Sequence, residues 1–161
     1  MKTLCLYYTR TNMTKEVMEN IAKVLNADMA EYTDGKDRHG FLGYVSACFA
    51  TVNNTIARVY VKGDIDLKAY DRVIIGMPVW VEGPCAIGRA LIKKYCDQLP
   101  SEVYYVVTHE GTNDYNAKIK AMDKLLGRSS SGQFSVRTKE NDYVKAGMDF
   151  ASALIRESDG K

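Results

Sequence analysis

Three threonines and an asparagine gather in the six residues that follow the first apolar run of the chain. The run TLCLYY, residues 3–8, ends at Thr9, and a helical pattern begins near Asn12. The unpaired N–H groups and partial positive charge of a helix N-terminus favour a bound phosphate. The hydroxyl groups of Thr9, Thr11 and Thr14 and the amide of Asn12 would add neutral donors. The segment therefore predicts a phosphate site; the alternative is an ordinary helix cap made by Thr11 or Asn12.

The only tryptophan of the chain lies in a second polar segment, GMPVWVEGP, at residues 76–84. This segment directly follows a strongly apolar strand pattern. Trp80 could form a wall against a flat aromatic ligand, with backbone N–H and C=O groups at the polar rim. Gly83 would let the backbone approach that ligand closely. The alternative is that Trp80 packs in the core.

A third segment of the same kind, THEGTNDY, occupies residues 108–115. Thr108 and Gly111 could offer hydroxyl and N–H donors to the edge of a heterocycle. His109 and Glu110 could act as acid and base, or could be exposed loop side chains. No Ser/His/Asp or Cys/His constellation accompanies them, so we expect no catalytic residue.

Alternating strand and helix patterns position these three segments. Strands are predicted at residues 3–8, 28–33, 71–78, 103–108 and 133–137, and helices at 12–25, 84–95, 114–126 and 142–156. The alternation predicts an α/β fold, in which one domain (residues 1–161) forms a doubly wound parallel sheet of five strands in the order 2-1-3-4-5. Ligands of such sheets bind at the carboxyl ends of the strands, where the three segments lie. Residues 35–57 suggest a loop followed by a helix.

Two details of the predicted helices concern packing. Pro84 is expected in the first turn of its helix, where the missing N–H has no consequence. The last helix carries Val144, Met148, Ala151 and Ile155 along one stripe. A stripe at this spacing is typical of the buried face of a helix.

Composition weighs against several classes of protein. The 161 residues carry a net charge of +2 with scattered basic residues, which gives no support for nucleic-acid binding. No apolar run approaches the ~18 residues that a membrane span needs, and no signal peptide is evident, so a cytoplasmic protein without a membrane partner is expected. The four cysteines and two histidines form no CxxC pair or cluster, so we expect free thiols and no metal site.

In this order, the three segments resemble the FMN-binding loops of the flavodoxin family. YYTRTNMT is similar to the phosphate loop of that family, T/S-x-T/S-G-N-T, and GMPVWVEGP resembles its second loop, G-x-P-x-W. THEGTNDY resembles its third, glycine-containing loop. The likeness covers nearly the whole chain and implies a flavodoxin-like three-layer sandwich with FMN as cofactor.

The resemblance implies a set of cofactor contacts on each loop. It implies phosphate contacts from Thr9, Arg10, Thr11, Asn12, Met13 and Thr14. It implies isoalloxazine contacts from Pro78, Val79, Trp80, Val81, Glu82 and Gly83. It implies that Thr108, His109, Glu110 and Gly111 line the pyrimidine side of the ring or the ribityl chain.

The phosphate loop departs from the family pattern at two positions. Asn12 stands at the usual glycine, and Met13 at the usual asparagine. Asparagine tolerates positive φ, so Asn12 could keep a glycine-like turn. Met13 cannot replace the hydrogen bonds of an asparagine side chain, so FMN binding is expected to persist with one polar contact fewer.

Two further expectations concern the environment of the ring. If Glu82, Glu110 and Asp114 lie close to it, their charges would lower its reduction potential. The peptide between Glu82 and Gly83 is the candidate hydrogen-bond partner of the ring, because glycine would let that peptide reorient.

The resemblance implies a monomer or weak homodimer that transfers electrons to a redox partner protein or a small-molecule acceptor. The alternative is an FMN-dependent NAD(P)H:quinone-type oxidoreductase. Flavodoxins that act as general carriers are usually acidic, which this chain is not. A phospho-acceptor receiver domain would need acidic residues where Thr9, Arg10, Met77 and Pro78 stand.

Overall fold

The computed structural model describes residues 1–36, 43 and 58–160, so the loop and helix expected at residues 35–57 lie almost entirely outside the described part. The strands are β1 (Thr3–Tyr7), β2 (Asp28–Thr33), β3 (Tyr60–Val61), β4 (Arg72–Trp80), β5 (Gly83–Pro84), β6 (Glu102–His109) and β7 (Gly132–Arg137). The α-helices are α1 (Met13–Leu25), α3 (Ala86–Tyr95), α4 (Asn116–Lys120), α5 (Asp123–Leu126) and α6 (Tyr143–Asp159), and a 3-10 turn, η1, spans Leu67–Ala69.

The sheet has the predicted parallel core with two short additions. Its strand order is β3-β2-β1-β4-β6-β7. The five strands β2, β1, β4, β6 and β7 run parallel to one another. These five strands reproduce the predicted order 2-1-3-4-5. The additions are antiparallel: β3 extends the edge beside β2, and β5 folds back on the end of β4. Two-residue strands have no hydrophobic period, which is why the sequence does not reveal them.

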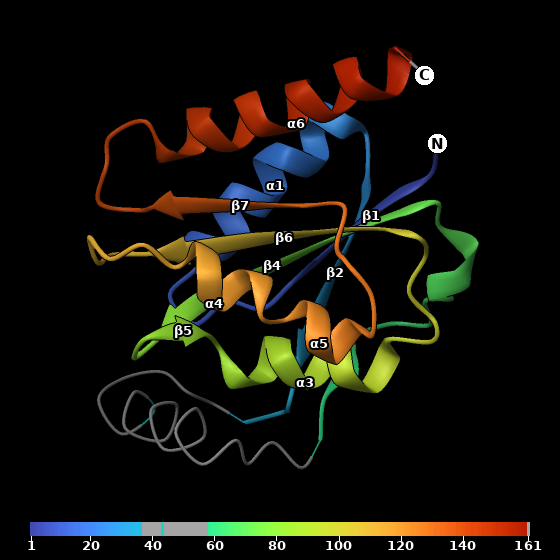
Figure 1. The fold of residues 1–161 in the computed structure, drawn as a ribbon, viewed down its shortest axis with the longest axis horizontal. Helices are drawn as coiled ribbons and strands as arrows, with labels where there is room; N and C mark the ends of the chain where they lie inside the picture. The colour runs from blue at the N-terminus through green and yellow to red at the C-terminus, as the bar shows by residue number, and fades with distance from the viewer. Residues whose placement is uncertain (37–42, 44–57, 161) are drawn as a thin grey trace.

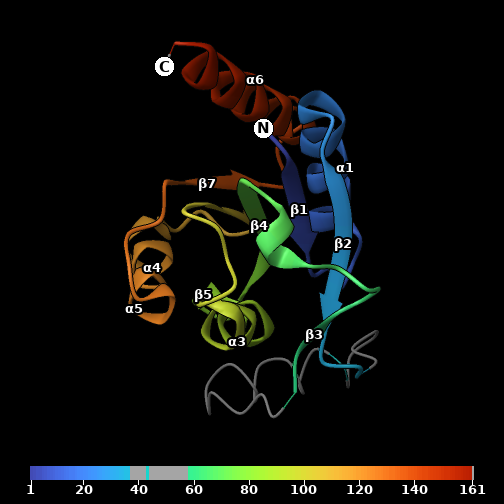
Figure 2. The ribbon, with the colours of Figure 1, turned by 90° about the vertical axis from the view of Figure 1, so that its right-hand side faces the viewer.

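Helices cover both faces of the sheet, which gives three layers. Helices α1 and α6 lie on one face, and α3, α4 and α5 lie on the other (Figures 1 and 2). Successive side chains of β1 point to opposite faces. Leu4 and Leu6 join the core under α3, and Cys5 and Tyr7 join the core under α1 and α6. Burial on both faces explains the continuous apolar runs of the strands.

The chain differs from the predicted helices at two places on the α3–α5 face. Pro84 is not in the first turn of α3, because it pairs with Val79 in β5. Helix α3 begins at Ala86 instead, and Cys85 is its N-cap. The single helix expected at residues 114–126 is two short helices, α4 and α5.

The buried face of α6 also differs from the predicted stripe. Met148 and Ile155 are 40% and 38% exposed, whereas Ala151 and Leu154 are buried. A Cβ on Gly147 would lie only 3.3 Å from Val17 of α1, so the backbone of α6 lies close to α1 at this glycine. Helix α6 therefore turns its smallest residue toward α1, and a search for large apolar residues misplaces its face.

The carboxyl ends of the central strands lie at one edge of the sheet. The register pairs Tyr7 of β1 with Gly76 of β4, and Pro78 of β4 with Thr108 of β6. The three segments singled out in the sequence are thereby brought together. None of the described helices is both long enough and apolar enough to cross a membrane.

Candidate functional site

A cavity of about 390 Å³ lies where the three segments meet. Its volume is within the range of small-molecule sites, roughly 300–1,000 Å³. It is lined by Arg10, Thr11, Met13, Thr14, Pro78, Val79, Trp80, Val81, Thr108, His109, Glu110, Gly111, Tyr115 and Thr138. The predicted residues that do not line it are Thr9, Asn12, Glu82 and Gly83. We call it the three-loop cavity.

The first loop has a glycine-like turn immediately before α1. Asn12 has φ 67° and ψ −8°, in the left-handed region, and its side chain makes no cap hydrogen bond. The expectation that Asn12 keeps the turn of a glycine is confirmed, and the alternative that its side chain caps the helix is wrong. The backbone N–H groups of the first turn of α1 remain available as donors.

The threonine hydroxyl groups of this loop differ in whether they have a hydrogen-bond partner. Thr14 Oγ1 lies 2.8 Å from Thr108 Oγ1 in a buried contact that joins the first loop to the third. Thr9 Oγ1 is buried, yet it has no hydrogen-bond partner among the residues that the structure describes. A buried hydroxyl without a partner costs about 1–3 kcal/mol and calls for an explanation, such as a bound ligand. Thr9 thus fits a donor to a phosphate oxygen.

The second segment is a strand and a hairpin turn, and Trp80 is the last residue of β4. Its side chain is 4% exposed and packs edge-on against Tyr8, with ring centroids 5.5 Å apart. The expectation that Trp80 lies outside the core is wrong. The pairing of Trp80 with Gly83 in β5 holds the strand extended through this residue. Trp80 nevertheless lines the three-loop cavity, so it belongs to the core and to the site.

The turn between β4 and β5 contains a strained residue. Val81 has φ 62°, a conformation that a β-branched residue rarely adopts and that costs about 1–3 kcal/mol. Gly83, by contrast, lies in β5 without a positive φ, and a Cβ there would lie in ordinary contact, 3.5 Å from Lys118. The expected freedom of Gly83 is therefore not what shapes this turn. The unusual backbone is one peptide earlier, at Val81.

In the third loop, His109 and Glu110 have separate partners. His109 Nδ1 lies 2.9 Å from the carbonyl oxygen of Gly111, and its ring centroid lies 4.8 Å from that of Tyr115. A carbonyl oxygen only accepts, so the imidazole donates in this contact. The Glu110 carboxylate lies 3.2 Å from the amine of Lys139. These contacts give no support for an acid–base pair.

Lysines also change the expected electrostatics of the site. The Glu82 carboxylate lies 3.1 Å from Lys118 Nζ, and Glu110 is paired with Lys139. Asp114 accepts a hydrogen bond from the backbone N–H of Asn116. Two of the three carboxylates that were expected to lower the potential of a bound ring are therefore partly neutralised.

Sequence reasoning missed two residues that line the cavity, Tyr115 and Thr138. A Cβ on Gly111 would lie 2.8 Å from the Tyr115 hydroxyl, so this glycine permits the close approach of the tyrosine. Thr138 follows β7, and its N–H donates to the His109 carbonyl oxygen over 2.8 Å. Its position after the fifth predicted strand is a signal that the carboxyl-end rule could have used.

No group of His, Cys, Asp or Glu side chains suited to a metal ion occurs among the described residues. Cys5, Cys85 and Cys96 are free thiols. Burial raises the pKa of Cys5 from 9.0 to about 12, so this thiol is not poised as a nucleophile.

A doubly wound parallel sheet with a three-loop cavity at the carboxyl ends of its strands is a flavodoxin-like fold. No protein-family model matches the chain, and no curated protein does. Solved structures do. A flavoprotein in complex with FMN from Lactobacillus acidophilus NCFM is 22% identical with a TM-score of 0.67, and the match covers 83% of this chain and 92% of that one.

Two further structures extend the comparison. Oxidised Flavodoxin 2 from Bacillus cereus is 13% identical with a TM-score of 0.60, over 98% of this chain and 99% of that one. The NAD(P)H:quinone oxidoreductase from Methanothermobacter marburgensis is 10% identical with a TM-score of 0.52, and the match covers 94% of this chain and 92% of that one. At these identities the likeness establishes the flavodoxin-like fold.

Proposed function

We propose that this protein binds FMN in the three-loop cavity and acts in electron transfer in the cytoplasm, with a redox partner protein or a small-molecule acceptor. The observation that carries the proposal is the buried, partnerless hydroxyl of Thr9 beside the N-terminus of α1. A phosphate group would accept hydrogen bonds from the Thr9 hydroxyl and from the N–H groups at the N-terminus of α1. The FMN complex of the similar Lactobacillus flavoprotein supports the choice of ligand.

Different residues at the cavity would bind the phosphate and the ring of FMN. Thr11 and Thr14, which line the cavity, and the N–H groups at the start of α1 would hold the phosphate. Thr9 does not line the cavity but directly precedes its lining residue Arg10, and the Thr9 hydroxyl would turn toward the phosphate. The β4–β5 turn and the third loop would flank the ring, with Trp80 and Tyr115 excluding water from its sides. Bound FMN would supply the electron transfer that no side chain of the protein provides.

The alternative is an FMN-dependent NAD(P)H:quinone-type oxidoreductase, which the shared fold of the Methanothermobacter enzyme supports. The two functions differ in the electron donor. Steady-state oxidation of NADH or NADPH by the FMN-loaded protein with a soluble quinone distinguishes them. Turnover well above that of free FMN would establish the oxidoreductase, and its absence would favour the electron carrier.

Titration with FMN and with riboflavin tests the binding proposal, because the two ligands differ only in the phosphate. We expect FMN fluorescence to be quenched on binding and riboflavin to bind far more weakly. Thr9→Val should weaken FMN binding about tenfold or more, since a hydrogen bond to a charged group contributes about 1.5–3 kcal/mol. It should leave riboflavin binding unchanged.

Thr3→Val is the matched control, because Thr3 is a buried threonine at the other end of β1. This variant should bind FMN as the unmodified protein does. Equal affinities for FMN and riboflavin, or no binding of either at micromolar protein, would refute the proposal.

A further inference from the structure

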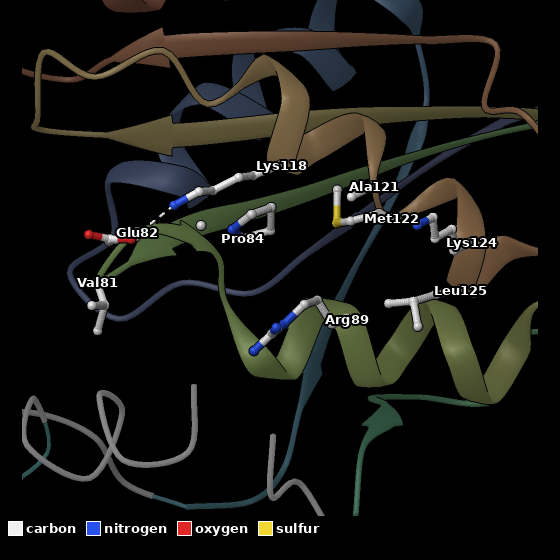
Figure 3. A pocket seen from close by; sticks show the side chains of 10 residues that line it. Val81, Glu82, Pro84, Arg89, Lys118, Ala121, Met122, Lys124 and Leu125 are labelled. Carbon is white, nitrogen blue, oxygen red and sulfur yellow. Dashed lines mark hydrogen bonds and ion pairs between the residues drawn. The ribbon is translucent and has the colours of Figure 1, made fainter. Parts of the chain in front are cut away.

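A second cavity lies on the other side of the β4–β5 turn, between the helices of one layer (Figure 3). It has a volume of about 520 Å³. The hairpin residues 81–84 form one end, Arg89 of α3 lies on one wall, and α4 and α5 form the other wall. We call it the α3–α5 groove. Val81 lines both this groove and the three-loop cavity.

The groove has an apolar interior of the size that a small organic ligand needs. Pro84, Ala121, Met122 and Leu125 supply its apolar surface, and Figure 3 shows Pro84 and Met122 between the two helical walls. Sites for small molecules combine such a lining with a few polar groups that fix orientation. A cavity of this kind suits a ligand with a flat or extended apolar body.

The charges around the groove favour a negatively charged ligand. Among the described residues, its lining contains Arg89, Lys118 and Lys124 and one acidic residue, Glu82. The Glu82 carboxylate is already paired with Lys118 at 3.1 Å. Lys124 forms no ion pair with any residue in the described part of the chain. Next to an apolar surface, where water screens less, the positive charge of Lys124 attracts an anion.

The helices around the groove also contain more basic than acidic residues. Helices α3, α4 and α5 together contain six basic residues and one acidic residue, Asp123. The acidic one is paired with Lys120 at 2.7 Å. Three of the six basic residues, Arg89, Lys118 and Lys124, line the groove itself.

We propose that the α3–α5 groove binds a small organic anion, an acid with an aromatic or extended aliphatic body, at a site separate from the three-loop cavity. The apolar body packs against Pro84, Met122 and Leu125, and the anionic group lies toward Lys124 and Lys118. This proposal does not depend on FMN binding.

Titration of the ¹⁵N-labelled full-length protein with 2-naphthoate, followed by NMR, tests the proposal. We expect the largest shifts at residues 82–84, 118–125 and around Arg89. Its neutral isostere, 2-naphthamide, should bind about fivefold more weakly, the effect of one partly exposed ion pair. Lys124→Gln should remove this difference between the two ligands.

Two variants serve as controls on this result. Lys93→Gln removes an exposed charge from α3 outside the groove and should change neither affinity. Ala121→Trp should fill the groove and abolish binding of both ligands, with the rest of the spectrum showing an intact fold. The proposal is wrong if 2-naphthoate shifts residues elsewhere, if both ligands bind equally, or if folded Ala121→Trp still binds.

Discussion

At the scale of single residues, two buried threonine hydroxyl groups near the candidate site are in opposite situations. Thr9 Oγ1 is buried without a partner in the described structure, whereas Thr14 Oγ1 bonds Thr108 Oγ1 over 2.8 Å. The first hydroxyl loses hydration without compensation, and the second is satisfied. Removal of the two groups should therefore have opposite effects on the flavin-free protein.

We predict that Thr9→Val raises the free energy of unfolding by about 1 kcal/mol and that Thr14→Val lowers it by about 1–2 kcal/mol. The second change leaves the Thr108 hydroxyl buried without its partner. Urea denaturation of both variants without added flavin measures the difference. If Thr9→Val destabilises the protein as much as Thr14→Val does, Thr9 has a partner and its role in phosphate binding loses its basis.

Val81 gives a second prediction at this scale. Its φ of 62° is strained for a β-branched residue, and the side chain is 51% exposed, so little packing depends on it. Val81→Gly should stabilise the fold by about 1 kcal/mol, because the relieved strain exceeds the entropy cost of glycine. Thermal unfolding measures the change. Val79→Gly, in the extended part of β4, is the control and should destabilise the protein.

Asn12, Trp80 and Val81 show how far residue types predict this site. Asn12 could be assigned a left-handed turn because few other residues adopt one readily. The position of Trp80 between Pro78 and Glu82, after an apolar strand, predicts a loop, but the pairing of β4 with β5 continues the strand. Nothing in the residue type of Val81 predicts positive φ. Its conformation follows from the two-residue connection between paired strands.

At the scale of elements, the sequence predicts the strands of the parallel core best. Their apolar runs are long and continuous because both faces are buried. Helix α6 shows the limit, since its phase depends on the close approach of Gly147 to α1. Of the predicted stripe, Ala151 is buried, but Val144 is half-buried, Met148 and Ile155 are exposed, and Leu154 outside the stripe is buried. Helical periodicity finds the helix but not the face that a small residue selects.

Neighbouring positions of α6 test its orientation directly. Leu154 is 3% exposed, and Ile155 is 38% exposed. Leu154→Ala should destabilise the protein by about 2–4 kcal/mol, because it leaves a cavity in the core. Ile155→Ala should cost well under about 1 kcal/mol. Chemical denaturation measures the free energy of unfolding of the two variants. A larger loss for Ile155→Ala would mean that α6 buries the face predicted from the sequence.

At the scale of the whole molecule, the near-neutral net charge conceals an uneven distribution. Helices α3, α4 and α5 carry six basic residues and one acidic residue, whereas α1 and α6 carry four basic and five acidic residues. The two layers lie on opposite faces of the sheet (Figure 2). A redox partner that approaches the α3–α5 face is therefore expected to present acidic side chains.

Buried acids on both faces of the sheet predict how the fold responds to alkaline pH. Burial raises the pKa of Cys5 to about 12 under α1 and α6, and it raises the pKa of Tyr32 and Tyr105 under α3–α5. These groups stay neutral in the fold but ionise in the unfolded chain, from 9.0 for the thiol and 10.0 for the phenols. The unfolded state then binds fewer protons, so stability falls as pH rises above 9.

Cys5 alone should reduce the free energy of unfolding by about 1.4 kcal/mol per pH unit between its two pKa values. The tyrosines add to this slope progressively as the pH approaches and passes 10, so the contribution of the thiol is the difference in slope between the unmodified protein and Cys5→Ala. Cys5→Ala should flatten the pH dependence there, even though it lowers stability at every pH by removing buried volume. Urea denaturation of the two proteins at each pH measures the slope. An unchanged slope in Cys5→Ala would mean that β1 opens to solvent at alkaline pH before the molecule unfolds.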